Sequence, residues 1–174
     1  LFVGSSSFTN WKDVQNYFPS HTIINRGFGG SSLTDVIRYA NDIIFPYQPK
    51  QIVIYCGEND IAGDSTVTGK MVFERLKKLY TDIRTHAAHV PIVYISMKPS
   101  PSRWSMKSRM LDGNSRIQKF LKKKNRNGVF VDVWKAMLGA NARPMEELFV
   151  EDMLHMNKNG YAIWQKLIQP YLIN

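Results

Sequence analysis

The sequence predicts a three-layer α/β domain built around a parallel sheet. Short β-rich runs of up to six residues alternate with longer segments of helical periodicity, giving five β-then-α units. Most of the short runs are apolar along their whole length, which is typical of strands that helices cover on both faces. The 174 residues show no break in composition, so we expect a single domain over 1–174.

The strands are predicted where apolar, β-branched and aromatic residues cluster between turn signals. The opening run "LFV" is the first, "TII" the second, "QIVIYC" the third, "PIVYIS" the fourth and "GVFVDV" the fifth. They occupy residues 1–3, 22–24, 51–56, 91–96 and 128–133.

The helices are predicted between these strands, where apolar residues recur at helical spacing with charges on the other face. They occupy residues 10–17, 31–44, 68–88, 106–125 and 157–171. Met106, Met110, Ile117 and Phe120 form such a stripe in the fourth helix, and we interpret it as core packing. Gly160 is a poor helix former, so we expect an irregular start to the last helix.

The composition is that of an ordinary globular chain, with 44% hydrophobic and 21% charged residues. No apolar run approaches the ~20 residues that a membrane-spanning helix needs, so no transmembrane segment is expected. The lone Cys56 excludes an internal disulfide and, within "IVIYC", is predicted to be a buried structural thiol. The chain opens directly on a strand-like run, which leaves the compartment undetermined, and nothing in it indicates an oligomeric state.

The net charge of +9 comes from residues 98–135, which hold eleven Lys and Arg against two Asp. Such a patch can attract nucleic acid, anionic membrane or acidic substrate. We favour the simpler interpretation, a solvated helix face whose last turn favours cations. The densest part, "KFLKKKNRN", has only Phe120 as a nearby aromatic, so we expect no nucleic-acid partner.

Since ligands bind at the carboxyl ends of parallel strands, the segments after the strands hold the candidate functional groups. "GSSSF" follows the first strand and places Ser6 at the entrance to a helix, where backbone N–H groups suit a nucleophile that creates an oxyanion. Ser5 and Ser7 compete for this role, and a helix-capping serine is the structural alternative.

Two further loops offer groups that could stabilise negative charge. "NRGFGGSS" lets the backbone approach a ligand closely, but Ser32 stands where a dinucleotide-binding G-x-G-x-x-G pattern needs glycine. In "GENDIAGD", Asn59 could donate its amide to an oxyanion, with an Asx turn as the structural alternative. The acidic residues of this loop do not have calcium-loop spacing, so we expect no metal.

"DMLH" near the C-terminus contains Asp152 and His155, which three residues of a turn can place on one side. The carboxylate would then hold the histidine in the tautomer whose Nε2 accepts a serine proton. The other histidines, His21, His86 and His89, have no such partner and are interpreted as surface residues. A serine, a glycine loop, an amide donor and an Asp–His pair together indicate acyl transfer through a serine nucleophile.

With these residues in this order, the chain resembles the SGNH (GDSL-like) hydrolase family from "FVGSSSF" to "YAIWQKLIQPYL". The resemblance places the nucleophile on Ser6, an oxyanion-hole glycine on Gly30 and the oxyanion asparagine of "GEND" on Asn59. It makes Asp152 the orienting acid and His155 the general base. The aspartate of the family's G-D-S turn is replaced by Ser5, as in family members with a G-S-S-S turn, and the "KPSPSRW" loop makes Arg103 and Trp104 candidates for substrate contact.

The resemblance implies a flavodoxin-like α/β/α sandwich of about five parallel strands. It also implies hydrolysis of carboxylic esters through an acyl-enzyme, without metal or cofactor, on small-molecule, glycan or lipid esters. Short acyl or acetyl esters of a carbohydrate or a lysophospholipid are the expected substrates. An acyltransferase with the same triad and a non-catalytic module that binds anionic ligands through the basic 98–135 segment are the alternatives.

Overall fold

The computed structural model describes residues 1–173, apart from the side chain of Asn125, and confirms the predicted α/β architecture. In the described part of the chain, four parallel strands form one sheet in the order β1-β2-β3-β4. Their bounds are β1 (Phe2–Gly4), β2 (Ile52–Tyr55), β3 (Ile92–Ile95) and β4 (Gly128–Val131).

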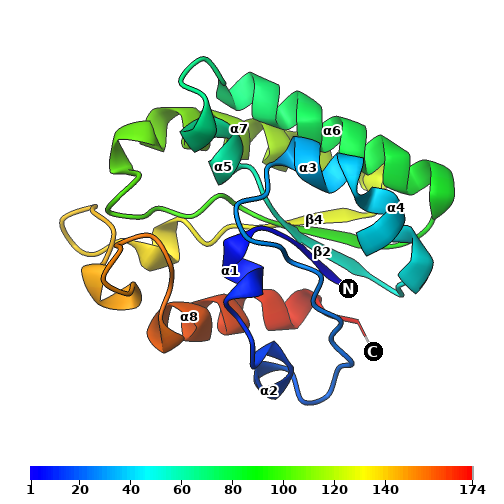
Figure 1. Ribbon diagram of the computed structural model, residues 1–174, viewed down its shortest axis with the longest axis horizontal. Coiled ribbons are helices and arrows are strands. Elements are labelled where there is room, and N and C mark those ends of the chain that lie inside the picture. The colour runs from blue at the N-terminus through cyan, green and yellow to red at the C-terminus, as the bar shows by residue number, and fades with distance from the viewer. Residues whose placement is uncertain (174) are drawn as a thin grey trace.

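Helices cover both faces of the sheet (Figure 1). One layer contains α3 (Leu33–Arg38), α4 (Ala40–Ile43), α5 (Glu58–Gly63), α6 (Gly69–His86) and α7 (Lys107–Leu121). The opposite layer contains α1 (Ser6–Thr9), α2 (Val14–Tyr17) and α8 (Lys158–Ile168). Short 3₁₀ segments join them: η1 (Phe45–Tyr47), η2 (Trp104–Met106), η3 (Lys124–Arg126), η4 (Lys135–Met137), η5 (Glu146–Leu148) and η6 (Gln169–Tyr171).

The strands are apolar throughout because successive side chains enter two different cores. On β2, Ile52 and Ile54 pack with the layer that contains α6 and α7, whereas Val53 and Tyr55 pack with the layer that contains α8. This alternation is what a strand buried on both faces requires. Cys56 is buried at the end of the same strand, as predicted.

The predicted strand at 22–24 is wrong as a strand, because only a single parallel bridge joins Asn25 to Phe2. The Phe2 N–H donates to the Ile24 carbonyl, but the N–H of Ile23 is taken by the side chain of Gln15. The Asn25 side chain is likewise occupied with the Phe8 carbonyl. Backbone pairing with β1 is centred on Asn25, one residue after the predicted range, because the Arg26 N–H donates to the Phe2 carbonyl at 2.8 Å.

Two predicted helices differ from the structure. Of the segment predicted at 10–17, only Val14–Tyr17 is helical, as α2, and the short helix α1 (Ser6–Thr9) lies before the predicted range. The segment predicted at 31–44 becomes α3 and α4, because the backbone leaves helical geometry at Tyr39. α5 was not predicted at all, since "ENDIAG" has no apolar periodicity.

The start of α8 is regular, contrary to the expectation of an irregular one. Asn157 caps it, because its side-chain oxygen accepts the N–H groups of Asn159 and Gly160 at 2.9 and 3.4 Å. Gly160 is buried, and a Cβ there would lie 2.7 Å from the Leu148 carbonyl oxygen. The glycine therefore permits a close contact between α8 and the segment before the candidate site.

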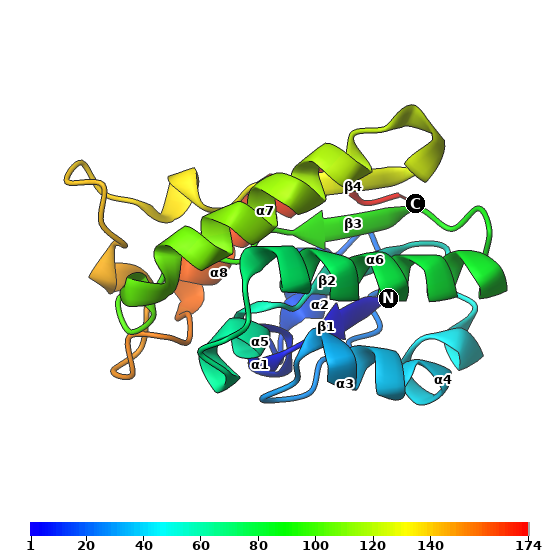
Figure 2. The ribbon, with the colours of Figure 1, turned by 90° about the horizontal axis from the view of Figure 1, so that it is seen from above.

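The carboxyl ends of the strands point toward the loops that hold the candidate residues. Figure 2 shows the yellow and orange segments, around residues 135–155, beyond these ends, away from the two chain termini. None of the helices within residues 1–173 has the length and apolar content to cross a bilayer.

Candidate active site

The turn after β1 places Ser6 at a fixed point. Gly4 has φ +146°, and a Cβ there would lie 1.8 Å from the Tyr55 carbonyl oxygen, so only glycine fits this close approach of β1 to β2. The Ser5 N–H donates to the same carbonyl at 3.1 Å, and Ser6 is the first residue of α1. The Ser6 N–H therefore belongs to the helix-terminal groups that lack an intrahelical acceptor.

Ser6, His155 and Asp152 form a continuous hydrogen-bonded line, although Ser6 and His155 are 149 positions apart in the sequence. The Ser6 Oγ lies 2.9 Å from His155 Nε2, and His155 Nδ1 lies 2.5 Å from Asp152 Oδ2. Neither Ser5 nor Ser7 makes a side-chain contact with His155 among the described residues, and both are buried. The geometry favours Ser6 over its two neighbours.

A tight turn at 150–155 brings the acid and the histidine together. The Val150 N–H donates to the His155 carbonyl at 2.9 Å, and Met153 adopts φ +55°, a left-handed conformation that is unusual for methionine. Asp152 Oδ1 accepts the N–H groups of Leu154 and His155, both at 2.8 Å. One carboxylate oxygen thus holds the turn and the other faces the imidazole.

The charge of Asp152 is stabilised by these contacts. Burial acts to raise the pKa of Asp152, but the hydrogen bonds from the His155 side chain and from the backbone of His155 and Leu154 lower it to about 2. The carboxylate is therefore an ionised acceptor well below neutral pH, and in a neutral His155 it fixes Nδ1 as the protonated nitrogen.

Ser31 links the glycine loop to the ends of β1 and β2. Its hydroxyl donates to the Gly4 carbonyl at 3.1 Å, and its carbonyl accepts the Asn59 Nδ2–H at 2.9 Å. Gly30, directly before it, has φ +76° and an N–H that donates to no protein acceptor within the described residues. Gly30 and Asn59 are thus tied through Ser31 to Gly4, the last residue of β1, two positions before Ser6.

A buried charged cluster lies directly beside Asn59. Glu58 pairs with Lys98 Nζ at 3.2 Å and with Arg103 Nη1 at 3.1 Å, and it accepts a hydrogen bond from the Tyr55 hydroxyl. Lys98 is 2% exposed and Glu58 4%, so these charges are almost fully removed from water. Burial lowers the pKa of Lys98, while the nearby Glu58 carboxylate acts to raise it.

Arg103 connects this cluster to Asn59, since its Nη2 donates to Asn59 Oδ1 at 2.8 Å. The preceding residue of the same loop contacts the 150–155 turn, because the Ser102 N–H donates to the Met153 carbonyl at 3.1 Å. The loop after β3 therefore contacts the segments that hold both Asn59 and His155.

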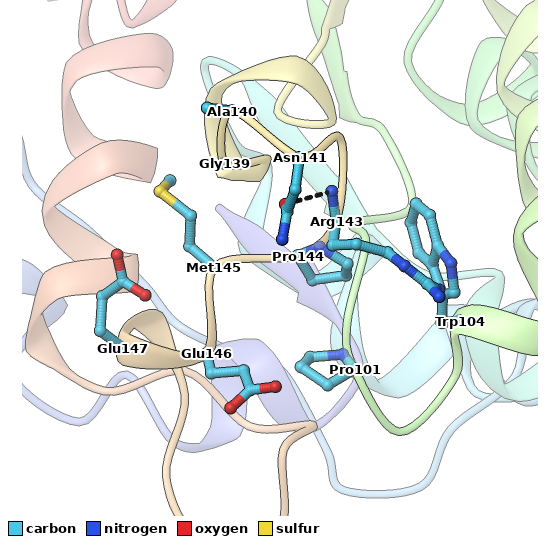
Figure 3. A pocket seen from close by; sticks show the side chains of 10 residues that line it. All are labelled: Pro101, Trp104, Gly139, Ala140, Asn141, Arg143, Pro144, Met145, Glu146 and Glu147. Carbon is cyan, nitrogen blue, oxygen red and sulfur yellow. Dashed lines mark hydrogen bonds between the residues drawn. The ribbon is translucent and has the colours of Figure 1, made fainter.

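A pocket of about 780 Å³ opens beside this loop. Figure 3 shows Trp104 and Arg143 on one side of it and the carboxylates of Glu146 and Glu147 on the other. Trp104 stacks on Trp134 with ring centroids 6.0 Å apart. The remaining lining residues are Pro101, Gly139, Ala140, Asn141, Pro144 and Met145.

The structure brings the predicted triad and oxyanion residues together, and further residues join them. Ser6, Asp152 and His155 meet directly, and Gly30 and Asn59 meet through Ser31. Ser31, Glu58 and Lys98 were not singled out as functional. No local signal marked the charged cluster, because Lys98 stands in a basic segment and its partner Glu58 is 40 positions away.

The acidic residues of the α5 loop are engaged in structural bonds. Asp60 accepts the Leu33 N–H at the start of α3 and pairs with Arg75 at 2.7 Å. Burial raises the pKa of Asp60, and the bonds from Leu33 and Arg75 partly offset this rise. Asp64 accepts hydrogen bonds from Thr66 within the following turn.

Several proteins of known structure have a similar fold. A Streptococcus pneumoniae protein described as a platelet activating factor is 21% identical with a TM-score of 0.86, covering 99% of this chain and 82% of that one. A GDSL-like lipase from Bacteroides thetaiotaomicron is 20% identical with a TM-score of 0.81, covering 97% and 84%. A variant of an acetyl-xylooligosaccharide esterase from Geobacillus is 14% identical with a TM-score of 0.75, covering 97% and 91%.

At these identities the three structures show a shared fold. No individually curated protein matches the sequence. The family description GDSL-like lipase/acylhydrolase, however, matches residues 3–163. The chain therefore belongs to the GDSL-like lipase/acylhydrolase family and is a carboxylic ester hydrolase.

Proposed function

We propose that this protein hydrolyses carboxylic esters with Ser6 as nucleophile, His155 as general base and Asp152 as the group that orients His155. The observation that carries this proposal is the unbroken line from Ser6 Oγ to His155 Nε2 (2.9 Å) and from His155 Nδ1 to Asp152 (2.5 Å). A serine, a neutral imidazole and a carboxylate in this arrangement are the parts of a serine hydrolase triad.

In the first half-reaction, the Ser6 oxygen attacks the ester carbonyl carbon while its proton passes to His155 Nε2. The resulting imidazolium is stabilised by the Asp152 carboxylate, whose pKa of about 2 keeps it ionised. His155 then gives the proton to the leaving alcohol oxygen as the C–O bond breaks, which leaves an acyl group on Ser6.

The negative charge on the tetrahedral intermediate needs donors that are already in place. We assign this role to the backbone N–H groups of Ser6 and Gly30 and to the Asn59 side-chain amide. Asn59 Nδ2 has two hydrogens, of which one is bonded to the Ser31 carbonyl, so the second remains for the substrate. Donors fixed by existing bonds require no reorganisation during the reaction.

In the second half-reaction, His155 takes a proton from water as the water oxygen attacks the acyl carbon. The second tetrahedral intermediate collapses, the C–O bond to Ser6 breaks, and Ser6 recovers its proton from His155. The net change is ester plus water to acid plus alcohol. An alcohol that replaces water in this step would give transfer instead, so product analysis with added methanol separates the two outcomes.

We further propose short acyl esters of a carbohydrate as the substrate class. The pocket beside the 98–104 loop is open and lined by Trp104, by Arg143 and by two carboxylates, and an aromatic ring with surrounding polar groups suits a sugar ring better than an acyl chain. One structural neighbour is an acetyl-xylooligosaccharide esterase, which supports an acetyl group and a sugar alcohol as the first compounds to test.

The test of the triad is hydrolysis of p-nitrophenyl acetate by the wild type and by Ser6→Ala. We expect Ser6→Ala to lose activity while its circular dichroism spectrum stays unchanged. Ser7→Ala is the matched control, because it removes a hydroxyl from the same turn without touching His155, and it should retain activity. A folded Ser6→Ala variant with wild-type turnover would refute the assignment of the nucleophile.

The oxyanion hole is tested with Asn59→Ala, for which we expect a 100- to 1000-fold lower kcat, as for the loss of one such donor elsewhere. The substrate class is tested by comparing acetylated xylooligosaccharides with a lysophospholipid. Trp104→Ala should raise KM for the oligosaccharide ester and leave p-nitrophenyl acetate hydrolysis unaffected. Faster cleavage of the lysophospholipid would overturn the carbohydrate proposal.

A further inference from the structure

The charged cluster under the 98–104 loop has no place in the reaction described so far. It joins Glu58 to Lys98 at 3.2 Å and to Arg103 at 3.1 Å, and Arg103 Nη2 donates to Asn59 Oδ1 at 2.8 Å. Buried charges of this kind are costly unless they are paired, and even a paired set is weak evidence of a stabilising role. The bond to Asn59 links this cluster to the candidate oxyanion donor.

We propose that Arg103 is a positioning residue that fixes the Asn59 amide in the orientation required of an oxyanion-hole donor. This inference rests on the proposed function, in which Asn59 donates to the tetrahedral intermediate. Arg103 itself need not touch the substrate.

The argument starts from the two ends of the Asn59 amide. An arginine guanidinium has donors only and stays charged, so the atom facing Arg103 must be the oxygen. The atom facing the Ser31 carbonyl must be the nitrogen, and it lies 2.9 Å away. A flipped amide would set donor against donor at Arg103 and acceptor against acceptor at Ser31, so both contacts enforce a single orientation.

The Arg103 guanidinium is itself held in place. Its Nη1 bonds to Glu58 Oε2 while its Nη2 bonds to Asn59, and Glu58 is anchored from behind by Lys98. The planar guanidinium of Arg103 therefore bridges the buried Glu58 carboxylate and the Asn59 amide oxygen. A lysine ammonium is a single point and cannot make both contacts in this fork geometry.

A charged donor on the amide oxygen also polarises the amide. Hydrogen bonds in a chain strengthen one another, so a bond that draws electron density to Oδ1 makes the Nδ2–H groups better donors. Arg103 thus acts on the orientation and on the donor strength of Asn59, and both effects matter only when an oxyanion forms. We therefore expect it to affect kcat and leave KM largely unchanged.

Arg103 can be removed without leaving a buried charge alone, because Glu58 remains paired with Lys98. Arg103→Ala should fold and should show a kcat about 10- to 30-fold below the wild type on p-nitrophenyl acetate, with KM within about twofold, since one charge-assisted bond is lost and Ser31 still holds the amide. Arg103→Lys should fall between the two.

The matched control is Arg84→Ala, which removes another arginine that bonds several groups. Arg84 donates to the carbonyls of Val90 and Arg126 at the opposite end of the sheet, at 2.6 and 2.8 Å. Its loss should lower the melting temperature and leave kcat unchanged. A loss of kcat in Arg103→Ala alone then cannot be a general consequence of destabilisation.

The decisive measurement is a double-mutant cycle with Asn59→Ala. If Arg103 acts through Asn59, Arg103→Ala has no further effect once the amide is gone, and the double variant equals Asn59→Ala. Low millimolar guanidinium should restore part of the kcat of Arg103→Ala and none of the kcat of the double variant. Multiplicative effects, a wild-type kcat in Arg103→Ala, or a raised KM with unchanged kcat would each overturn the inference.

These failures are distinct from failure of the proposed function. If Ser6→Ala is inactive and Asn59→Ala impaired while Arg103→Ala is normal, only the positioning role is lost. If Ser6→Ala keeps full activity, the triad assignment falls and the role of Arg103 falls with it.

Discussion

Asp152→Asn is expected to inactivate the enzyme by selecting the wrong histidine tautomer. Asp152 Oδ1 accepts two backbone N–H groups, from Leu154 and His155, and Oδ2 faces His155 Nδ1. In the asparagine variant the remaining oxygen must take the position between the two N–H groups. The new NH₂ then donates to Nδ1, so the proton of His155 moves to Nε2 and points at Ser6.

The size of the effect follows from the same two bonds. To recover the active tautomer, the amide must flip and leave both backbone N–H groups without an acceptor, at about 1–3 kcal/mol each. Asp152 is 46% exposed, so water replaces part of what is lost, and we expect about 2 kcal/mol in total, or about 30-fold. Loss of the charge that stabilises the imidazolium adds to this; the corresponding change in a serine protease triad costs about 10⁴-fold.

The comparison variant is Asp152→Ser, whose hydroxyl can still accept from the backbone of the turn but cannot reach Nδ1. Both variants lack the carboxylate, so their difference isolates the tautomer. With kcat measured on p-nitrophenyl acetate, the expected order is wild type, then serine, then asparagine, with about 30-fold between the last two. An asparagine variant as active as the serine variant would refute the reasoning.

Three further predictions concern stability. Gly4→Ala should fold poorly or lose more than about 3 kcal/mol in urea unfolding, because its Cβ would lie 1.8 Å from the Tyr55 carbonyl oxygen; a variant of normal stability would contradict that contact. Gly160→Ala, which in an exposed helix would stabilise by about 1 kcal/mol, should instead lower the melting temperature, since the Cβ would lie 2.7 Å from the Leu148 carbonyl oxygen. The folded-state pKa of Asp152 is lowered from 3.8 to about 2, so its stabilising contribution is complete above pH 3.8 and lost as the pH falls toward 2. The difference in unfolding free energy between wild type and Asp152→Asn should shrink as the pH falls from about 4 toward 2; an unchanged difference over that range would argue against it.

The central part of the fold was predictable because burial on both faces leaves a plain sequence signal. β2 and β3 are apolar runs whose residues enter two cores, and α6 and α7 show clear helical periodicity. The segment 22–24 is a β-rich run in the sequence, but its pairing with β1 is a single bridge at Asn25. How far such a run pairs depends on how it packs against β1, which no local pattern records.

The candidate site divides in the same way. Ser6, Gly30, Asn59, Asp152 and His155 stand in short motifs, so their types and order were readable. The contacts of Arg103 with Asn59 and of Lys98 with Glu58 join residues 44 and 40 positions apart. They depend on how the loop after β3 folds over the ends of two strands, and a basic residue in a basic segment carries no sign of that.

The two halves of the site are held by different parts of the fold, and one loop joins them. The Ser6 half is tied to the sheet through Gly4, Ser31 and Asn59, whereas His155 lies on a turn outside the sheet. The loop after β3 bonds to both, through Arg103 to Asn59 and through the Ser102 N–H to the Met153 carbonyl. Catalysis needs the base and the oxyanion donors aligned with the nucleophile at the same moment, and misplacement by about 1 Å costs about 100-fold. A change that shifts the backbone of this loop should therefore impair proton transfer and oxyanion stabilisation together, whereas a change confined to the Arg103 side chain should impair only the second.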